Sequence, residues 1–186
     1  MNNSEIFHAN GTYKNKIGVT DPVVLSKEVG AEVPLRFYVA RSDADPSKIR
    51  ADLFALNEKL FTNVYPFAGK LRTFAGRGSL GECAPGSTGA SLSETAQLVH
   101  GLKFTNDDRR DVMAEKLAKV VEKITVARPF AAGNTATAVA YAVELANRNG
   151  YTLDAKMLQP TTLREIKQSA RTGNSAAIAD SFKSSL

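Results

Sequence analysis

Apolar side chains recur at helical spacing along most of the chain. Between residues 46 and 61 they fall at every third or fourth position, which puts them on one face of a helix. This first stripe consists of Ile49, Leu53, Leu56 and Leu60. A second stripe lies in residues 106–127 and consists of Val112, Met113, Leu117, Val120, Val121 and Ile124. Both patterns predict amphipathic helices that pack on a shared core.

Residues that favour helix ends divide the rest of the chain. Asp21 and Pro22 suit the N-cap and the first position of a short helix. Thr105 or Asn106 is expected to cap the helix of 106–127, and Pro129 is expected to end it. Further helices are predicted over 91–101, 134–149, 161–173 and 175–185.

Strand signals are weak. Residues 62–91 are rich in Gly, Ser and Pro and contain only short apolar pieces, a composition that favours turns. One small β-hairpin or loop is predicted around residues 70–84. The chain is therefore expected to be a mainly α protein with one domain over residues 1–186.

Composition narrows the class of protein only modestly. The chain has 186 residues, of which 43% are hydrophobic and 23% charged, with a formal net charge of +5. Lys and Arg are spread along the sequence rather than clustered, which is typical of a solvated surface and argues against a nucleic-acid binder. Cys83 is the single cysteine, so an intrachain disulfide and a cysteine-based metal site are both excluded.

Targeting features are absent from the sequence pattern. No apolar run approaches the ~20 residues that a membrane span needs, and the first residues lack the apolar core of a cleaved signal. We expect a cytoplasmic protein without a membrane partner. Delivery into a host cell by a secretion system that leaves no cleaved signal is compatible with this expectation.

The segment Arg128–Val139, RPFAAGNTATAV, has the form of a turn that opens an Ala-rich helix. The first N–H groups of a helix and its positive dipole end suit a phosphate group. Within the segment, however, there is no Asp, Glu, His or Lys, and Arg128 is its only charged residue. The shape of a phosphate site is present without the side chains that would perform chemistry in it.

Three segments in order resemble the Fic domain family. They are GTYKNKIGVTDPVVL (11–25), LFTNVYPFAGKLRT (60–73) and RPFAAGNTATAVAYAVELANRNGYTLD (128–154). The resemblance covers about residues 8–182. It implies a small helical fold with a flap hairpin, and an enzyme that transfers AMP from ATP, with magnesium, to a hydroxyl group of a target protein.

The family motif is His-Pro-Phe-x-(Asp/Glu)-Gly-Asn-Gly-Arg-x-x-Arg. In such a motif the His serves as general base and the acid holds Mg²⁺. The Gly-Asn-Gly turn presents N–H groups to the phosphates, and the arginines stabilise phosphate charge. A flap hairpin before the motif would position the target segment by strand addition.

This sequence keeps the turn residues of that motif and lacks its reactive ones. The base position is Arg128 and the metal position is Ala132. An arginine stays protonated in proteins and cannot accept a proton, so no catalytic base and no metal ligand are expected here. The second glycine is replaced by Thr135, and the two arginines by Ala136 and Val139.

Two hypotheses follow for the function, and a third rests on charge alone. The first is a pseudoenzyme that no longer transfers AMP and acts by binding a protein partner: an active Fic protein, an antitoxin or the former target. The alternative is a Fic-type transferase that moves AMP or another phosphate-bearing group. In that case ATP with magnesium would be its cofactor, and Gly133, Asn134, Thr135 and Arg128 would form its phosphate site. The third, a nucleic-acid binder, is supported only by the net charge of +5.

Overall fold

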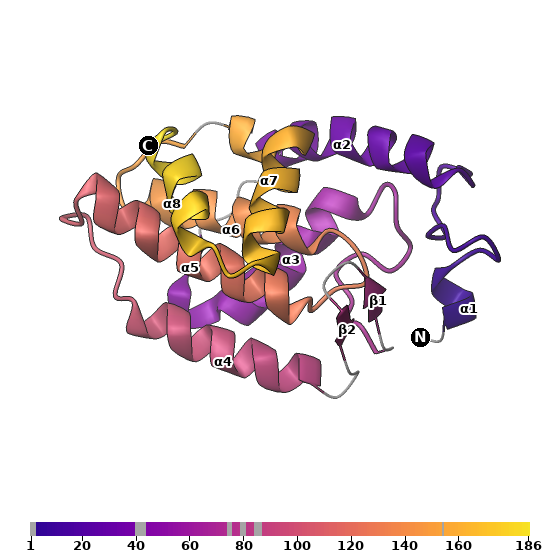
Figure 1. The fold of residues 1–186 in the computed structure, drawn as a ribbon, viewed down its shortest axis with the longest axis horizontal. Helices are drawn as coiled ribbons and strands as arrows, with labels where there is room; N and C mark the ends of the chain where they lie inside the picture. The colour runs from indigo at the N-terminus through magenta and orange to yellow at the C-terminus, as the bar shows by residue number, and fades with distance from the viewer. Residues whose placement is uncertain (1–2, 40–43, 74–75, 79–80, 84–86, 154) are drawn as a thin grey trace.

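Helices make up most of the computed structural model (Figure 1), which describes residues 3–39, 44–73, 76–78, 81–83, 87–153 and 155–186. In chain order the helices of this described part are α1 (Asn3–Ile6), α2 (Pro22–Val39), α3 (Ile49–Phe61), α4 (Ser87–Gly101), α5 (Arg110–Ala127), α6 (Asn134–Arg148), α7 (Pro160–Arg171) and α8 (Ser175–Lys183). Two short 3₁₀ helices, Pro46–Lys48 and Ala155–Leu158, precede α3 and α7. The prediction of a mainly α protein is confirmed.

A small hairpin interrupts the helices between α3 and α4. Strand β1 (Gly76–Gly78) pairs antiparallel with β2 (Gly81–Cys83), and Arg77 lies opposite Glu82. This hairpin lies within the region of 70–84 where the sequence predicted one. The expected small flap element is therefore present in the fold, and residues 74–75, 79–80 and 84–86 lie outside the described part.

Helix α2 begins as predicted and extends farther than predicted. The Asp21 carboxylate caps it by accepting the N–H groups of Val23 and Val24, at 2.8 and 3.0 Å. The expectation of a short helix is wrong, because the helix has 18 residues and continues to Val39 with Pro34 in its interior. Pro34 and Phe37 are buried, and this tertiary packing outweighs the local cost of proline inside a helix.

The start of α5 also differs from the prediction. The helix begins at Arg110, and its N-cap residue, Arg109, makes no side-chain capping hydrogen bond. Asp108 instead accepts the N–H of Thr105 at 3.2 Å and pairs with Lys116, 2.6 Å from its ammonium. Asp108 therefore fixes the preceding loop and does not cap the helix.

Helix α6 is the centre of the fold. Every residue from Ala136 to Ala146 is buried, and α6 packs against α3, α5 and α7. Because many of these residues are alanine, neighbouring helices approach α6 closely. In Figure 1, α4 runs along the lower edge and α2 along the upper edge, with α7 and α8 nearer the viewer than α5 and α6.

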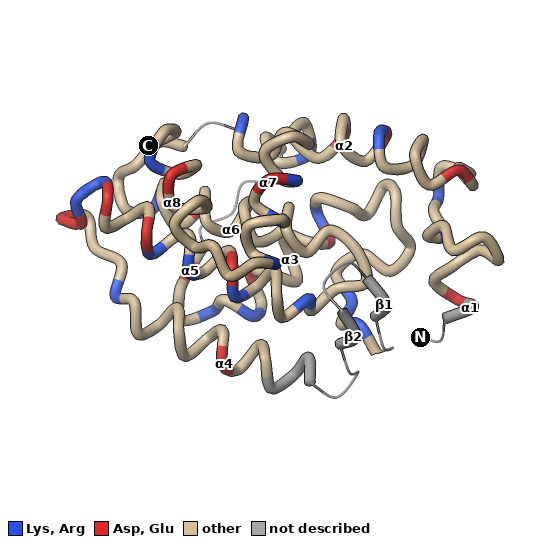
Figure 2. Tube along the Cα trace, viewed as in Figure 1, with Lys and Arg blue, Asp and Glu red and all other residues tan. Residues whose placement is uncertain are grey.

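Both ends of the chain contribute to one buried hydrophobic cluster. Ile6 and Leu25 join it from the N-terminal side, and Ile178 and Phe182 join it from α8. Acidic and basic residues are interspersed along the described helices (Figure 2), as the even spread of Lys and Arg in the sequence predicted. None of the described helices is both long and apolar enough to cross a membrane.

Candidate functional site

The loop between α5 and α6, residues 128–133, keeps a defined turn geometry. Arg128 follows the last residue of α5 in the left-handed conformation, with φ of 48°, and its N–H donates to the Ile124 carbonyl at 3.1 Å. Glycine is the usual residue at such a position, and Pro129 next in the chain disfavours a continued helix. The position that resembles the family's base is therefore a helix C-cap whose side chain is a permanent cation.

Asn134 closes this loop through both ends of its side-chain amide. Its Oδ1 accepts the N–H of Phe130 at 2.8 Å, and its Nδ2 donates to the carbonyl of the same residue at 2.9 Å. It is the first residue of α6, and the N-cap is Gly133. The side chain of Asn134 is thus used for loop structure, with its amide committed to Phe130.

Position 133 requires glycine, both for its backbone conformation and for the closeness of Phe61. Its φ is +77°, and a Cβ atom built there would lie 2.2 Å from Cε2 of Phe61. Asn57 fixes the same corner from α3, donating to the Ala132 carbonyl at 3.2 Å and to Oγ1 of Thr137 at 3.0 Å. Helices α3 and α6 are joined at the point where the phosphate-binding turn would lie.

Two residues that the sequence interpretation missed hold the loop from its other side. Arg72 is buried; its backbone N–H donates to the Pro129 carbonyl at 2.8 Å, and its Nε donates to the Arg128 carbonyl at 3.1 Å. The Tyr13 hydroxyl donates to the Ala131 carbonyl at 2.7 Å. Both residues lie in segments that resemble the Fic family, and this resemblance was the signal that could have identified them.

A cavity of about 580 Å³ lies beside this loop and the first turn of α6. Its walls come from α2, from the loop and from α7, and include all four residues predicted for a phosphate site: Arg128, Gly133, Asn134 and Thr135. The structure brings these four together, although the amide of Asn134 is already engaged. His8 and His100 do not line the cavity.

The cavity wall carries positive charge and no acid among the described residues. Arg128, Arg164 and Lys167 line it, and no Asp, Glu or His does. Although the Lys167 side chain is exposed, partial desolvation lowers its pKa, and the nearby charges of Arg128 and Arg171 lower it further. Arg164 and Lys167 were not predicted as site residues, because the helix that bears them is distant in sequence from the motif.

The tyrosines of this cavity remain neutral at physiological pH. Burial raises the pKa of Tyr13, an effect that the charges of Arg128 and Arg72 partly offset. Burial, together with the neighbouring Tyr13, raises the pKa of Tyr65 well above its ordinary range. Neither hydroxyl supplies a proton acceptor near pH 7.

The described residues of this site do not fit a magnesium ion. Mg²⁺ takes oxygen ligands, usually with at least one carboxylate. Position 132 offers only the methyl group of an alanine, and no acidic side chain of the described residues lines the cavity. Across the described part of the chain there is also no group of three or more His, Cys, Asp or Glu residues that could hold a metal ion.

The fold is helical, and its buried central helix begins directly after a loop that contains a Pro-Phe pair and a Gly-Asn turn. This arrangement defines a class of protein. Residues 48–146 match the sequence profile of the Fic/DOC family. The chain belongs to this family, and the resemblance inferred from the sequence is confirmed. No curated protein matches the chain significantly.

Solved structures agree on the fold. The chain is similar to the BepC protein of Bartonella tribocorum, a VirB-translocated effector with bound AMPPNP, at 19% identity and a TM-score of 0.78, covering 99% of this chain and 96% of that one. It is also similar to the N-terminal Fic domain of a VirB-translocated Bep effector from Bartonella quintana, at 20% identity and a TM-score of 0.76, covering 99% and 92%. A third such domain, from Bartonella sp. AR 15-3, has 19% identity and a TM-score of 0.73, covering 97% and 90%.

Proposed function

We propose that this member of the Fic/DOC family does not transfer AMP and acts by binding a protein partner. The observation that carries the proposal is the composition of the cavity wall. Its described residues include three cations and no Asp, Glu or His. A cavity of this kind has no carboxylate for a metal ion and no imidazole to take a proton from an attacking hydroxyl.

The expected loss of rate is large. Removing general-base help alone costs about 10²–10⁴-fold. Position 128 holds an arginine, which cannot replace the base. The positions of the two motif arginines are now Ala136 and Val139, and both side chains are buried in the hydrophobic core. Losses of base, metal ligand and phosphate contacts together would suppress transfer even where a nucleotide binds.

The retained part of the motif supports a binding role. Asn134, Gly133 and Asn57 maintain the loop through hydrogen bonds and close packing, so its shape has been kept while its reactive groups have been replaced. A surface of fixed shape beside a cavity suits recognition of a protein. We propose a cytoplasmic partner of one of three kinds: an active Fic protein, an antitoxin, or a target that is bound without being modified.

The relatives of known structure add one further possibility for the place of action. They are named as VirB-translocated effectors. If this chain is delivered in the same way, its partner is a host protein, and the proposed binding function is unchanged.

One observation favours the alternative, a transferase with altered chemistry. Lys167 lines the cavity, and its pKa is lowered by desolvation and by Arg128 and Arg171. A neutral amine can accept a proton, so Lys167 is the side chain of the described cavity wall that would replace the missing base. In that case transfer would depend on Lys167 and would increase with pH.

The deciding experiment is label transfer from α-labelled ATP. The purified protein is incubated with bacterial or host lysate and Mg²⁺, beside an active Fic protein as positive control. We expect no labelled band above the background without protein. A band that disappears in Lys167→Gln and persists in Lys119→Gln, an exposed lysine of α5, would establish the alternative. A band that disappears in Asn134→Ala, with the helical circular dichroism retained, would likewise overturn the proposal.

The binding half of the proposal needs its own measurement. Proteins retained by the immobilised chain are identified, purified and titrated against it by calorimetry. We expect one of them to bind with a defined stoichiometry. If none of the proteins retained from bacterial or host lysate binds the chain after purification, the partner-binding function is wrong, even when label transfer is absent.

A further inference from the structure

Large apolar side chains that are exposed concentrate on α2. Among the described residues, five of the eight such side chains lie on this helix, and each is between 46% and 82% exposed. They are Val23, Val24, Leu35, Tyr38 and Val39. A single exposed apolar residue is ordinary on a protein surface, but a group of them on one element indicates a contact surface.

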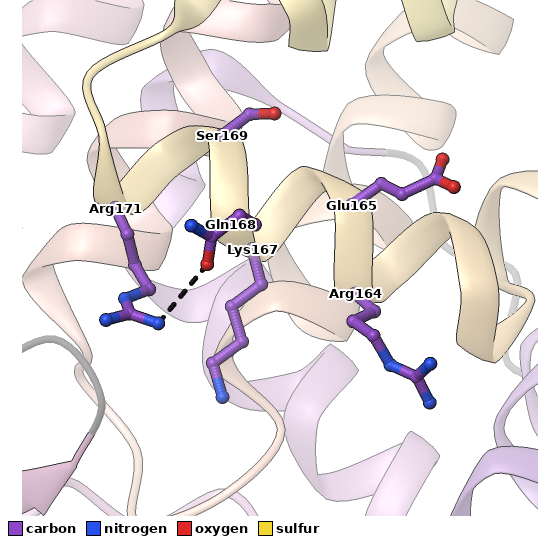
Figure 3. A pocket seen from close by; sticks show the side chains of 6 residues that line it. All are labelled: Arg164, Glu165, Lys167, Gln168, Ser169 and Arg171. Atoms are coloured by element: carbon purple, nitrogen blue, oxygen red, sulfur yellow. Dashed lines mark hydrogen bonds between the residues drawn. The ribbon is translucent and has the colours of Figure 1, made fainter.

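Helix α7 shows the ordinary composition of an outer helix surface. The six side chains that Figure 3 draws on it are all polar, and Arg164, Lys167 and Arg171 among them are cations. Helix α2 also lies at the outside of the molecule, along the upper edge in Figure 1. A place at the surface therefore does not by itself account for the apolar side chains of α2.

The exposed side of α2 has the spacing of a helix–helix interface. Five exposed residues are separated by four, three, four and three positions, which places them in one row along the helix, as at the contact positions of a coiled coil. They are Val24, Glu28, Ala31, Leu35 and Tyr38, and we call them the outer row. Residues of α2 that join the hydrophobic core, such as Leu25 and Phe37, do not belong to this row, so folding leaves it open to solvent.

The sizes of the side chains in the outer row suit a second helix. Ala31 lies at the centre of the row, and Val24 and Tyr38 each lie seven residues from it. A small residue between larger ones lets another helix approach closely while the larger side chains pack on either side of it. Tyrosine is also enriched among the residues that dominate binding energy at protein interfaces.

Glu28 is the one charged member of the outer row. Its side chain forms no ion pair or hydrogen bond with any described residue. A helix that covered the row would remove water from this carboxylate, which costs free energy unless a cation pairs with it. A partner that fits the row therefore places Lys or Arg opposite Glu28.

The outer row of a second copy of this chain supplies no such cation. In a parallel pair of α2 helices, Glu28 of one copy would face Glu28 of the other, and the two like charges would repel one another. In an antiparallel pair, each Glu28 would lie opposite an apolar member of the row and would lose its hydration without gaining a cation. Both arrangements favour a different protein as the occupant.

We propose that the outer row of α2 binds an amphipathic helix of another protein, whose apolar side chains pack on the row and whose Lys or Arg pairs with Glu28. This inference rests on the proposed binding function, because it names a surface and a kind of partner that this function uses. The outer row is separate from the cavity beside the motif loop, which α2 lines with other residues, among them Leu25, Val29 and Val33.

The test uses two labelled synthetic peptides of about three heptads, both amphipathic and helical, with leucine at the other contact positions. One peptide carries Lys at the central contact position and the other carries Glu there. Fluorescence anisotropy at low peptide concentration measures the affinity of each for the full chain. We expect the Lys peptide to bind about tenfold more tightly than the Glu peptide, and we expect Glu28→Lys to reverse this preference.

Apolar variants and matched controls test the row itself. Leu35→Ser and Tyr38→Ser should each weaken binding of the Lys peptide about tenfold or more. These side chains are 68% and 59% exposed, so both variants should retain the helical circular dichroism of the wild type. Val126→Ser removes an exposed apolar side chain from α5, and Glu115→Lys reverses an exposed acidic charge on the same helix. Both controls should bind the peptides as the wild type does.

The proposal is overturned if neither peptide binds, if control and site variants lose affinity equally, or if Glu28→Lys leaves the preference unchanged. Sedimentation of the chain alone tests the other occupant: a dimer that Leu35→Ser dissociates would show that a second copy covers the outer row, and would also overturn the proposal. Failure of the proposed binding function has a different signature, the absence of any purified protein that binds the chain. A purified partner that binds wild type and Leu35→Ser equally would keep that function and reject this surface.

Discussion

Gly133 is the residue whose replacement tests the shape of the motif loop most directly. Its φ is +77°, and an added Cβ would meet Phe61 at 2.2 Å, whereas Gly150 has φ of +81° with nothing within 4 Å of an added Cβ. Gly150→Ala should therefore cost only the conformational term, about 1–2 kcal/mol. Gly133→Ala should cost that term plus about 1–3 kcal/mol of overpacking against Phe61.

Chemical denaturation of both variants measures this difference. The pair is matched, because both residues adopt nearly the same backbone conformation and both become alanine. Equal losses of unfolding free energy would show that Phe61 moves aside freely. In that case the loop would not be held by close packing at this residue.

At the scale of elements, the junction between α4 and α5 depends on an ion pair that responds to acid. Burial by itself would raise the pKa of Asp108, but hydrogen bonds from Lys116 and the Thr105 N–H, with the Lys116 charge, lower it below its ordinary 3.8. The side chains of Asp108 and Lys116 are 11% and 16% exposed. Because the folded-state pKa is lowered, the pair stabilises the fold fully above pH ~4, and this stabilisation is lost as the pH falls through the folded pKa.

The variant Asp108→Asn should therefore lower the free energy of unfolding by about 1–2 kcal/mol at pH 7, with an allowance for nearby solvent. Its difference from the wild type should shrink as the pH falls below 4, because the wild-type carboxyl then becomes neutral as well. Urea denaturation between pH 2 and 7 measures both curves. Asp180→Asn, in an exposed pair at 3.6 Å, should change stability by less than about 0.5 kcal/mol throughout. A constant difference across this range would mean that the shape of the carboxyl, rather than its charge, is what matters.

Helix patterns in the sequence were reliable where local and tertiary preferences agree. The stripe over residues 46–61 predicted α3 because its apolar positions are the ones buried. The end of α2 and the start of α5 were missed for a shared reason. Pro34 is buried in a helix that packs against α3, and Asp108 pairs with the ammonium of Lys116 instead of capping α5. Residues that favour helix ends indicate neither this packing nor this choice of partner.

At the scale of the whole molecule, the sequence predicts only those site residues that lie near one another along the chain. Arg128, Gly133, Asn134 and Thr135 lie in one short segment, so the sequence alone grouped them, and they do line one cavity. Arg164 and Lys167 join that cavity only because α7 folds back beside α6. The sequence shows that both side chains are charged. The cavity that they line depends on the packing of helices that are far apart along the chain.

The last prediction is that the molecule unfolds as one cooperative unit. The family match ends at residue 146, yet Phe182 of α8 and Leu53 of α3 are both fully buried in one hydrophobic cluster. A shared core favours cooperative unfolding, because its parts lose their packing together. Leu53→Ala and Phe182→Ala should each lower the free energy of unfolding by about 2–5 kcal/mol and move a single thermal transition, with calorimetric and van't Hoff enthalpies equal. Val126→Ala, at a side chain 49% exposed, should shift that transition by much less. If Phe182→Ala produced a separate early transition while Leu53→Ala moved only the later one, α8 would be a unit that unfolds independently, and the expected single domain over residues 1–186 would be wrong.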